Sequence, residues 1–233
     1  MKVAVMQPYF FPYIGYIQLM YAVDAFVIFD DVQYINRGWI NRNRIRGESG
    51  PIWLTMPVRK ASRSLPINQR FYELSGADCV RYVERCLSTS YAKADYKAES
   101  MRLISALLDH GESNVATANT RLLTGLARML GIECEFMLSS QIEKPGELKG
   151  QAKVLDICQR VGATHYVNLP GGKALYDAST FEEAGLSLSF LNTLVAPAVL
   201  GGEPQYLSII DGLMHKGVVG AKAQLTLYEL QAG

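Results

Sequence analysis

The sequence lacks several features on which common functional assignments rest. Its four cysteines show neither C-x-x-C spacing nor a histidine at zinc-finger distance, so we expect free thiols and no structural metal. No HExxH motif and no Ser-His-Asp order appears, which leaves metalloprotease and serine hydrolase chemistry unsupported. No apolar run reaches the roughly 20 residues of a membrane span, because Asp24 interrupts the longest candidate.

The chain also lacks an excess of charge of either sign. Its 23 basic and 22 acidic residues give a formal net charge of +1, which provides no general field to hold a polyanion such as DNA. We therefore expect no nucleic-acid partner, and any phosphate site must be local. Residues 2–6 run directly into a Pro and aromatic cluster without a cleavage site, so we expect no signal peptide and a cytoplasmic protein.

Short apolar runs that alternate with helical periodicity predict an α/β fold. Residues 3–6 and 25–29 have the pattern of buried parallel strands, and the apolar residues between them recur at helical spacing. Further strands are expected at residues 52–56, 133–138, 164–168 and 186–191, with helices at 149–160, around Phe181 and at 206–215. This alternation implies a mostly parallel, Rossmann-like sheet with helices on both faces.

Residues 77–131 differ from the rest of the chain because their apolar pattern is helical throughout. Three helices are predicted there, and Gly111 and Gly131 are placed as helix stops. We expect a single domain over residues 1–233, within which residues 77–131 form a helical insertion, subdomain or lid.

Three motifs lie in the first 43 residues: MQPYFFPYIGY at 6–16, DDVQY at 30–34 and RGWINRN at 37–43. Further motifs follow at residues 149–150, 156–158, 166–168, 171–177, 181 and 208–211. Together they resemble the WbqC-like family of bacterial surface-polysaccharide gene clusters, and the resemblance covers nearly the whole chain. The sequence departs from the family pattern at residues 195–205 and at His215.

The resemblance implies a transferase of O-antigen and related lipopolysaccharide or polysaccharide biosynthesis. The group transferred to a sugar would be glycine or another aminoacyl group, and a nucleotide would take part. A non-catalytic nucleotide-sugar-binding or scaffolding protein of a glycan-assembly complex is the alternative. In either case the expected partner is a small molecule: a nucleotide sugar, an amino acid or ATP.

Ligands of parallel α/β sheets bind beyond the carboxyl ends of the strands, and here these ends are polar. Gly15 would let a ligand approach the first helix, whose N-terminus favours an anion. The segment resembles the H-x-G-H turn of adenylyl-transferring enzymes, with Tyr13 and Tyr16 at the histidine positions. The predicted cradle comprises Gln7, Tyr9, Tyr13, Gly15 and Tyr16, and simple packing is the alternative for its aromatic members.

Asp30 and Asp31 follow the second predicted strand, with Gln33 beside them. Adjacent carboxylates can hold Mg²⁺ on the phosphates of ATP or a nucleotide sugar, or one of them can act as a general base. We therefore predict that both are catalytic and that Gln33 contacts substrate. The alternative is that the aspartates cap the turn after the strand.

A run of arginines and asparagines around Trp39 suggests a ligand clamp, because guanidinium groups bind phosphate and an indole face binds a ring. The predicted clamp comprises Arg37, Trp39, Asn41 and Arg42, with Lys60 as a further charge, and a solvated loop is the alternative. Asn168, Gly171, Gly172 and Lys173 resemble half of a phosphate loop, although two glycines can also simply turn the chain.

Overall fold

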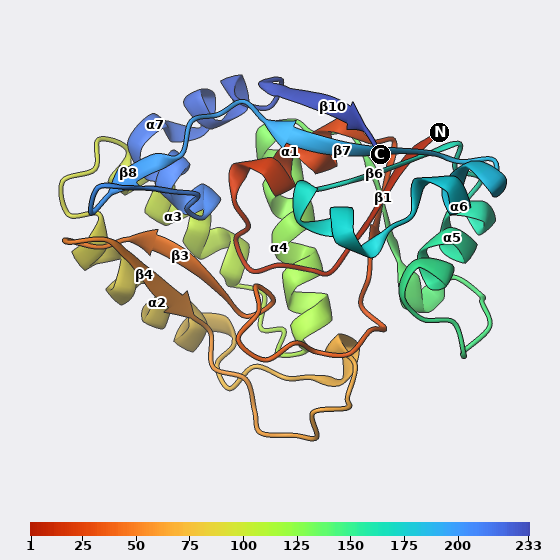
Figure 1. Ribbon diagram of the computed structural model, residues 1–233. Coiled ribbons are helices and arrows are strands. Elements are labelled where there is room, and N and C mark those ends of the chain that lie inside the picture. Colours follow the sequence, from red (N-terminus) through yellow and green to blue (C-terminus); the bar gives the residue numbers. More distant parts are fainter.

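A computed structural model describes residues 1–233 and contains a six-stranded sheet, whose strands β1, β6, β7 and β10 are labelled at the upper right of Figure 1. The strand order is β10-β7-β6-β1-β2-β5. The strands are β1 (Lys2–Met6), β2 (Ala25–Ile28), β5 (Glu135–Leu138), β6 (His165–Asn168), β7 (Ser187–Thr193) and β10 (Tyr228–Ala232). All neighbouring pairs are parallel except β10, which pairs antiparallel with β7 at one edge. The predicted mostly parallel sheet is confirmed.

The strand order reverses direction next to β1. From β1 the chain continues to β2 and then β5 on one side, and it later returns to add β6 and β7 on the other side. Loops after β1 and β6 therefore diverge at the carboxyl end of the sheet. Such a topological switch point leaves a crevice, which is where ligands bind in open α/β sheets.

Helices cover both faces of the sheet, because successive strand residues point to opposite sides. Ala4 of β1 joins a core with α1 (Ile14–Ala22) and α7 (Ile209–Ala223), whereas Val3 and Val5 join a core with α5 (Gly150–Arg160) and α6 (Ala178–Glu183). Figure 1 shows α5 and α6 together at one end of the molecule. The two helical layers enclose β1, β2 and β6 from both sides.

The three helices expected between residues 77 and 131 are present as α2 (Gly76–Ser90), α3 (Lys97–Leu108) and α4 (Val115–Leu130). The Asn114 side chain caps α4 by accepting a hydrogen bond from the Thr117 amide at 3.1 Å. Gly131 ends the same helix with a φ of 69°, a backbone conformation that glycine adopts readily. Buried residues of all three helices share one core with the sheet. The expectation that these helices form a separate subdomain or lid stays a prediction.

Residues 52–56 were expected as the third strand and the arginine-rich segment before them as a clamp or loop. Instead, β4 (Pro51–Thr55) pairs with β3 (Arg42–Arg46) in an antiparallel hairpin outside the main sheet. In β3 the odd-numbered residues Asn43 and Ile45 are buried, and the even-numbered arginines are more exposed. The Asn43 amide donates to the Phe11 carbonyl at 2.9 Å, which fixes the hairpin against the loop after β1.

The remaining elements are short. A second hairpin contains β8 (Ala198–Leu200) and β9 (Glu203–Gln205) and leads into α7, which extends beyond the helix predicted at residues 206–215. Three 3-10 helices, η1 (Ile67–Gln69), η2 (Ser139–Gln141) and η3 (Pro170–Leu175), lie in connecting segments. None of the helices combines the length and apolar character that crossing a bilayer requires.

Candidate ligand-binding cleft

Two cavities of about 540 and 380 Å³ adjoin at the switch point, and Tyr9, Tyr13, Trp39 and Gly171 line both of them. We call the pair the switch-point cleft. The larger cavity, the sheet chamber, lies at the carboxyl ends of the strands, and the smaller one, the tyrosine chamber, extends from it toward the β3 and β8–β9 hairpins. Both volumes lie within the range typical of small-molecule sites.

The sheet chamber is built where β1 and β6 diverge. Met6 and Gln7 line it at the end of β1, and Asn168 lines it at the end of β6. The first residues of α5, Gly150 and Gln151, also face it, and no side chain caps the N-terminus of that helix. Because the N-terminal end of a helix carries exposed N–H groups and a partial positive charge, this wall favours an anion.

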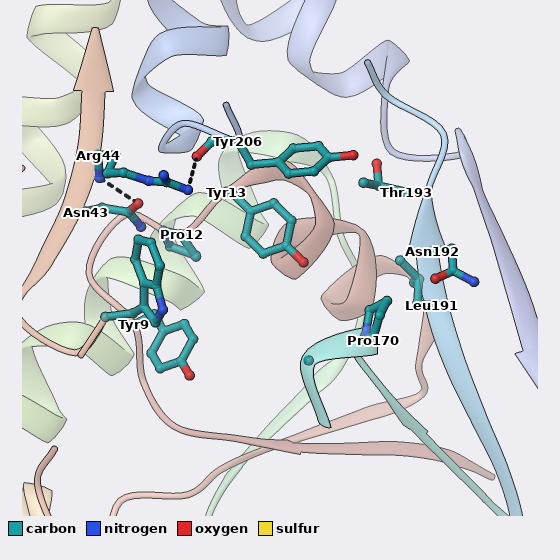
Figure 2. Close-up of a pocket in the computed structure, with 12 residues that line it drawn as sticks. Tyr9, Pro12, Tyr13, Asn43, Arg44, Pro170, Leu191, Asn192, Thr193 and Tyr206 are labelled. Atoms are coloured by element: carbon teal, nitrogen blue, oxygen red, sulfur yellow. Dashed lines mark hydrogen bonds between the residues drawn. The ribbon is translucent and has the colours of Figure 1, made fainter. Parts of the chain in front are cut away.

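The tyrosine chamber has aromatic rings on one side and smaller side chains opposite. Figure 2 shows Tyr9, Tyr13 and Tyr206 on one side of the opening and Leu191 and Thr193 on the other, while the Asn192 amide is turned toward β10, where it donates to Gln231 at 3.3 Å. The Tyr13 and Tyr206 rings lie 5.6 Å apart. Burial, followed by the nearby Tyr206 and Tyr9 hydroxyls, raises the pKa of Tyr13 to about 12, so its hydroxyl is a neutral hydrogen-bond donor at physiological pH.

Arg44 is the only charged residue that lines the switch-point cleft. Its Nη1 donates to Gln205 at 2.6 Å and its Nη2 to the Tyr206 carbonyl at 3.4 Å, whereas its buried Nε has no partner. The guanidinium carbon also lies 5.4 Å from the centre of the Trp39 ring. One fixed cation, one indole and no carboxylate make the cleft complementary to an anionic ligand that carries a ring.

The two predicted catalytic aspartates do not reach this cleft. Asp30 is buried and accepts hydrogen bonds from the Ser140 amide at 2.9 Å and the Ser140 hydroxyl at 2.6 Å. It lines a different cavity, and Asp31 lines neither chamber. The expected convergence of the aspartates with the tyrosine-rich segment is therefore wrong, because both carboxylates bind the segment that follows β5, on the side of β2 away from β1 and β6.

Asp31 is held by cations rather than presented to a ligand. Lys144 and Lys153 each place their Nζ 3.0 Å from its carboxylate, and the Ser139 hydroxyl donates to it at 2.7 Å. Burial alone would raise its pKa, but the hydrogen bonds from Ser139 and the two lysines outweigh burial and lower it. Asp30 and Asp31 have separate partners, Ser140 for one and the two lysines for the other, and a shared Mg²⁺ site stays a prediction. A catalytic role for either aspartate stays a prediction, and both residues lie outside the cleft.

Two members of the predicted cradle have structural surroundings instead. Tyr16 is fully buried, and its hydroxyl donates to the Gln7 carbonyl at 2.7 Å, so it cannot contact a ligand directly. A Cβ added at Gly15 would lie 2.5 Å from Cε2 of Tyr13. Gly15 therefore makes room for the Tyr13 ring over the start of α1, rather than for a ligand as expected.

Only Trp39 of the predicted clamp lines the cleft. The Arg42 guanidinium lies 3.9 Å from the centre of the Trp53 ring and donates to the carbonyls of Gly38 and Arg37. The Asn41 amide accepts from the Tyr34 hydroxyl and donates to the Met56 carbonyl, each at 2.7 Å. Arg42 and Asn41 therefore shape the loop that carries Trp39, and the exposed Arg37 belongs to its turn, with a φ of 59°.

Three further predicted contacts lie away from both chambers. Gln33 donates to the Arg63 carbonyl at 2.9 Å, Lys173 donates to Gln231 at 2.7 Å, and Lys60 is exposed. The predicted residues that the structure does bring together around the cleft are Gln7, Tyr9, Tyr13, Trp39, Asn168, Gly171 and Gly172.

Several cleft residues were not assigned to the site from the sequence. Arg44 appeared there only as one member of an arginine run, although the period of two in Arg42–Arg46 would have indicated a strand that aims alternate side chains at one face. Tyr206, Asn192 and Thr193 come from the C-terminal third of the chain, and no local pattern marks them. Their place depends on the packing of β7 and the β8–β9 hairpin.

Comparison with known proteins gives one family and one close relative without an assigned role. The sequence model of the WbqC-like protein family matches residues 7–223. The chain is 31% identical over 229 residues to the uncharacterized protein Rv1507c of Mycobacterium tuberculosis, with 95% of each chain covered. No solved structure shows a significant match. The chain therefore belongs to the WbqC-like protein family.

Proposed function

We propose that the switch-point cleft binds a nucleotide-linked sugar or a similar phosphorylated donor for a transfer reaction in cytoplasmic surface-glycan biosynthesis. The observation that carries the proposal is the lining of the cleft. It joins Arg44 and the uncapped N-terminus of α5 to aromatic walls, and it contains no carboxylate.

Each part of such a ligand has a matching wall. A diphosphate needs a guanidinium fork and backbone N–H groups, which Arg44 and the start of α5 supply. A base or sugar ring packs on an aromatic face, which Trp39 and Tyr9 supply. Sugar hydroxyls pair with polar side chains such as Gln7 and Thr193.

The transfer reaction is the part of the proposal that rests on the family resemblance. An aminoacyl group, such as glycine, would be delivered to the sugar, with ATP consumed if the amino acid is activated in the same site. A non-catalytic nucleotide-sugar-binding protein is the second candidate. It is favoured by one observation: no Asp, Glu, His, Cys or Ser side chain lines the cleft to act as base or nucleophile.

Isothermal titration with UDP-sugars, UDP and ATP tests the binding proposal. We expect saturable binding of a nucleotide sugar to the wild-type chain and a loss of about 10- to 100-fold in affinity in Arg44→Gln, since hydrogen bonds to charged groups contribute about 1.5–3 kcal/mol. Arg59→Gln is the matched control because Arg59 is exposed and lines neither chamber. Equal affinity in both variants would exclude Arg44 as the anion contact.

Tryptophan fluorescence gives an independent readout. The chain has two tryptophans, and Trp53→Phe leaves Trp39, which lines the cleft, as the only one. Ligand binding in the cleft should then change the remaining emission with the same dissociation constant that titration gives. Mass spectrometry of reactions with donor, acceptor amino sugar, glycine and ATP separates a transferase from a pure binder.

A further inference from the structure

The strand β10 forms an open edge of the six-stranded sheet. It pairs with β7 on one side only, and Figure 1 shows it at the upper margin of the molecule. The residues Glu229–Ala232 are exposed. The strand contains no proline, lysine or arginine, although such residues commonly protect a sheet edge from pairing with another chain. We propose that β10 pairs antiparallel with β10 of a second copy of this chain, an association independent of the proposed ligand.

Backbone hydrogen bonds define which residues of β10 point to the open edge. The Leu227 carbonyl accepts from the Leu194 amide at 2.8 Å, and the Gly233 amide donates to the Leu188 carbonyl at 3.0 Å. Backbone groups of successive residues in a strand point to opposite edges. The odd-numbered residues of β10 therefore face β7, and the amides and carbonyls of the even-numbered residues point outward, where another strand can reach them.

A two-fold axis at Leu230 gives the register that uses most of these outward groups. Leu230 then exchanges two hydrogen bonds with its own copy, and each Ala232 amide donates to the Tyr228 carbonyl of the other copy, so about four hydrogen bonds join the strands. The Tyr228 amide is not counted, because it donates to the Thr226 carbonyl at 3.0 Å. An axis at Glu229 would instead place two like charges directly opposite each other, which is destabilising.

Charge complementarity in this register favours a second copy as the partner. Glu229 of one copy lies opposite Gln231 of the other, with both side chains on the same face of the joined sheet. Lys173 crosses that face above Phe190 and donates to the Gln231 side chain at 2.7 Å. Glu229 itself is exposed and takes part in no ion pair. Pairing therefore brings Glu229 of each copy beside Lys173 of the other, and the two-fold axis forms this contact twice.

The opposite face of β10 adds an apolar contact. Leu230 pairs with Leu191 of β7 on one side and is still 36% exposed, because no strand follows on the other side. In the proposed dimer Leu230 packs against its own copy, and directly opposite side chains of this kind stabilise an antiparallel pair. A contact between two short strands is small for a specific interface, so we expect a weak, reversible dimer whose population rises with chain concentration.

Sedimentation equilibrium of the full chain over a concentration series tests the pairing. The average mass should rise reversibly from that of one chain toward that of two. Leu230→Pro removes an outward amide that β7 does not use, so it should weaken the dimer by about tenfold or more and leave the circular dichroism spectrum unchanged. Leu230→Ala keeps the amide and is the matched control for the backbone contact, with a smaller loss of affinity expected.

Charge reversal separates this dimer from any other. Glu229→Lys and Lys173→Glu should each weaken self-association by about tenfold or more, because each places like charges together at both contacts. When the two variants are mixed in equal amounts, opposite charges meet again at both contacts. The mixture should therefore form a heterodimer within about threefold of the wild-type affinity. Lys93→Glu is the control, since Lys93 is exposed and lies outside β10 and its contacts.

Three results would overturn the proposal. One is a wild-type chain that stays monomeric up to a concentration of about 1 mM. Another is a dimer whose affinity neither charge reversal changes. The third is a mixture of the two charge-reversal variants that associates no better than each variant alone. If Leu230→Pro does not fold, the mixing experiment still decides, because both of its substitutions are at exposed side chains.

Discussion

Replacing Asp31 with Asn should destabilise the fold rather than abolish chemistry. The carboxylate lies 3.0 Å from both Lys144 and Lys153, whose side chains are only 7% and 12% exposed. Asn has nearly the same shape but no charge, so the variant leaves two largely buried ammonium groups without a counterion. Catalytic involvement of Asp31 predicts the opposite pattern, with activity lost and stability retained.

The magnitude follows from the burial of the three groups. Breaking a fully buried ion pair by removing one partner costs about 3–5 kcal/mol. The Asp31 side chain is 21% exposed, so solvent screens part of the interaction. We expect a loss of about 2–3 kcal/mol in the free energy of unfolding, which corresponds to a decrease of about 5–10 °C in melting temperature for a chain of this size.

Urea denaturation of wild type and Asp31→Asn at neutral pH measures this loss, and a series toward lower pH adds a second test. The folded-state pKa of Asp31 is below its usual value near 3.8, so its stabilisation is complete above that value and disappears as the pH falls through the folded pKa. The difference between the proteins should therefore shrink in acid. Surface substitutions usually change the free energy of unfolding by no more than about 0.5 kcal/mol. If Asp31→Asn changes it by no more than that at neutral pH, the reasoning is refuted.

Two further substitutions test the packing that positions the cleft. Gly15→Ala should lower the free energy of unfolding by about 1–3 kcal/mol, because the new Cβ would lie 2.5 Å from the Tyr13 ring. Thermal melts of the double variant, in which Tyr13→Ala removes that ring, should show most of the lost stability restored. Asn119→Leu should lower the free energy of unfolding by about 2–4 kcal/mol, because it removes the hydrogen bonds to the Pro8 and Ile40 carbonyls at 2.8 and 2.7 Å. An unchanged free energy of unfolding in urea would contradict this prediction.

The sequence pattern was sufficient for β1, β2, β5, β6 and β7 of the sheet and for the residues next to the ends of β1 and β6, whereas the edge strand β10 was not predicted. Continuous apolar runs identify β1 and β2 because both faces of those strands are covered by helices. Gln7 and Asn168 follow their strands directly, so their place at the carboxyl edge depends only on the topology. Tyr13 and Trp39 lie within the motifs that resemble the family and face the same cleft.

The fate of the two aspartates could not be predicted in the same way. What separates Asp30 from Asp31 is contact with Ser140, Lys144 and Lys153, which lie more than 100 positions away in the sequence. Two adjacent carboxylates give the same local signal whether they hold a metal, anchor a loop or pair with lysines. Only the long-range packing of β5 and α5 beside β2 decides among these roles.

Arginines presented a related difficulty. Residues 37–46 contain four of them, and residue type alone favours each equally as a phosphate ligand. In the structure Arg42 stacks on Trp53, Arg46 forms an ion pair with Asp211 at 2.9 Å, and Arg44 faces the cleft. The partners of Arg44 and Arg46 lie 161 and 165 positions away in the sequence, so selection among the arginines required the fold.

A crystal structure of the wild-type chain with a bound nucleotide sugar is the most direct test of the central claim that the switch-point cleft is an anion site. The account predicts density for the diphosphate within hydrogen-bonding distance of the Arg44 guanidinium and for a ring against Trp39. Density in the cavity between the β8–β9 hairpin and α7, or a diphosphate bound away from Arg44, would contradict it.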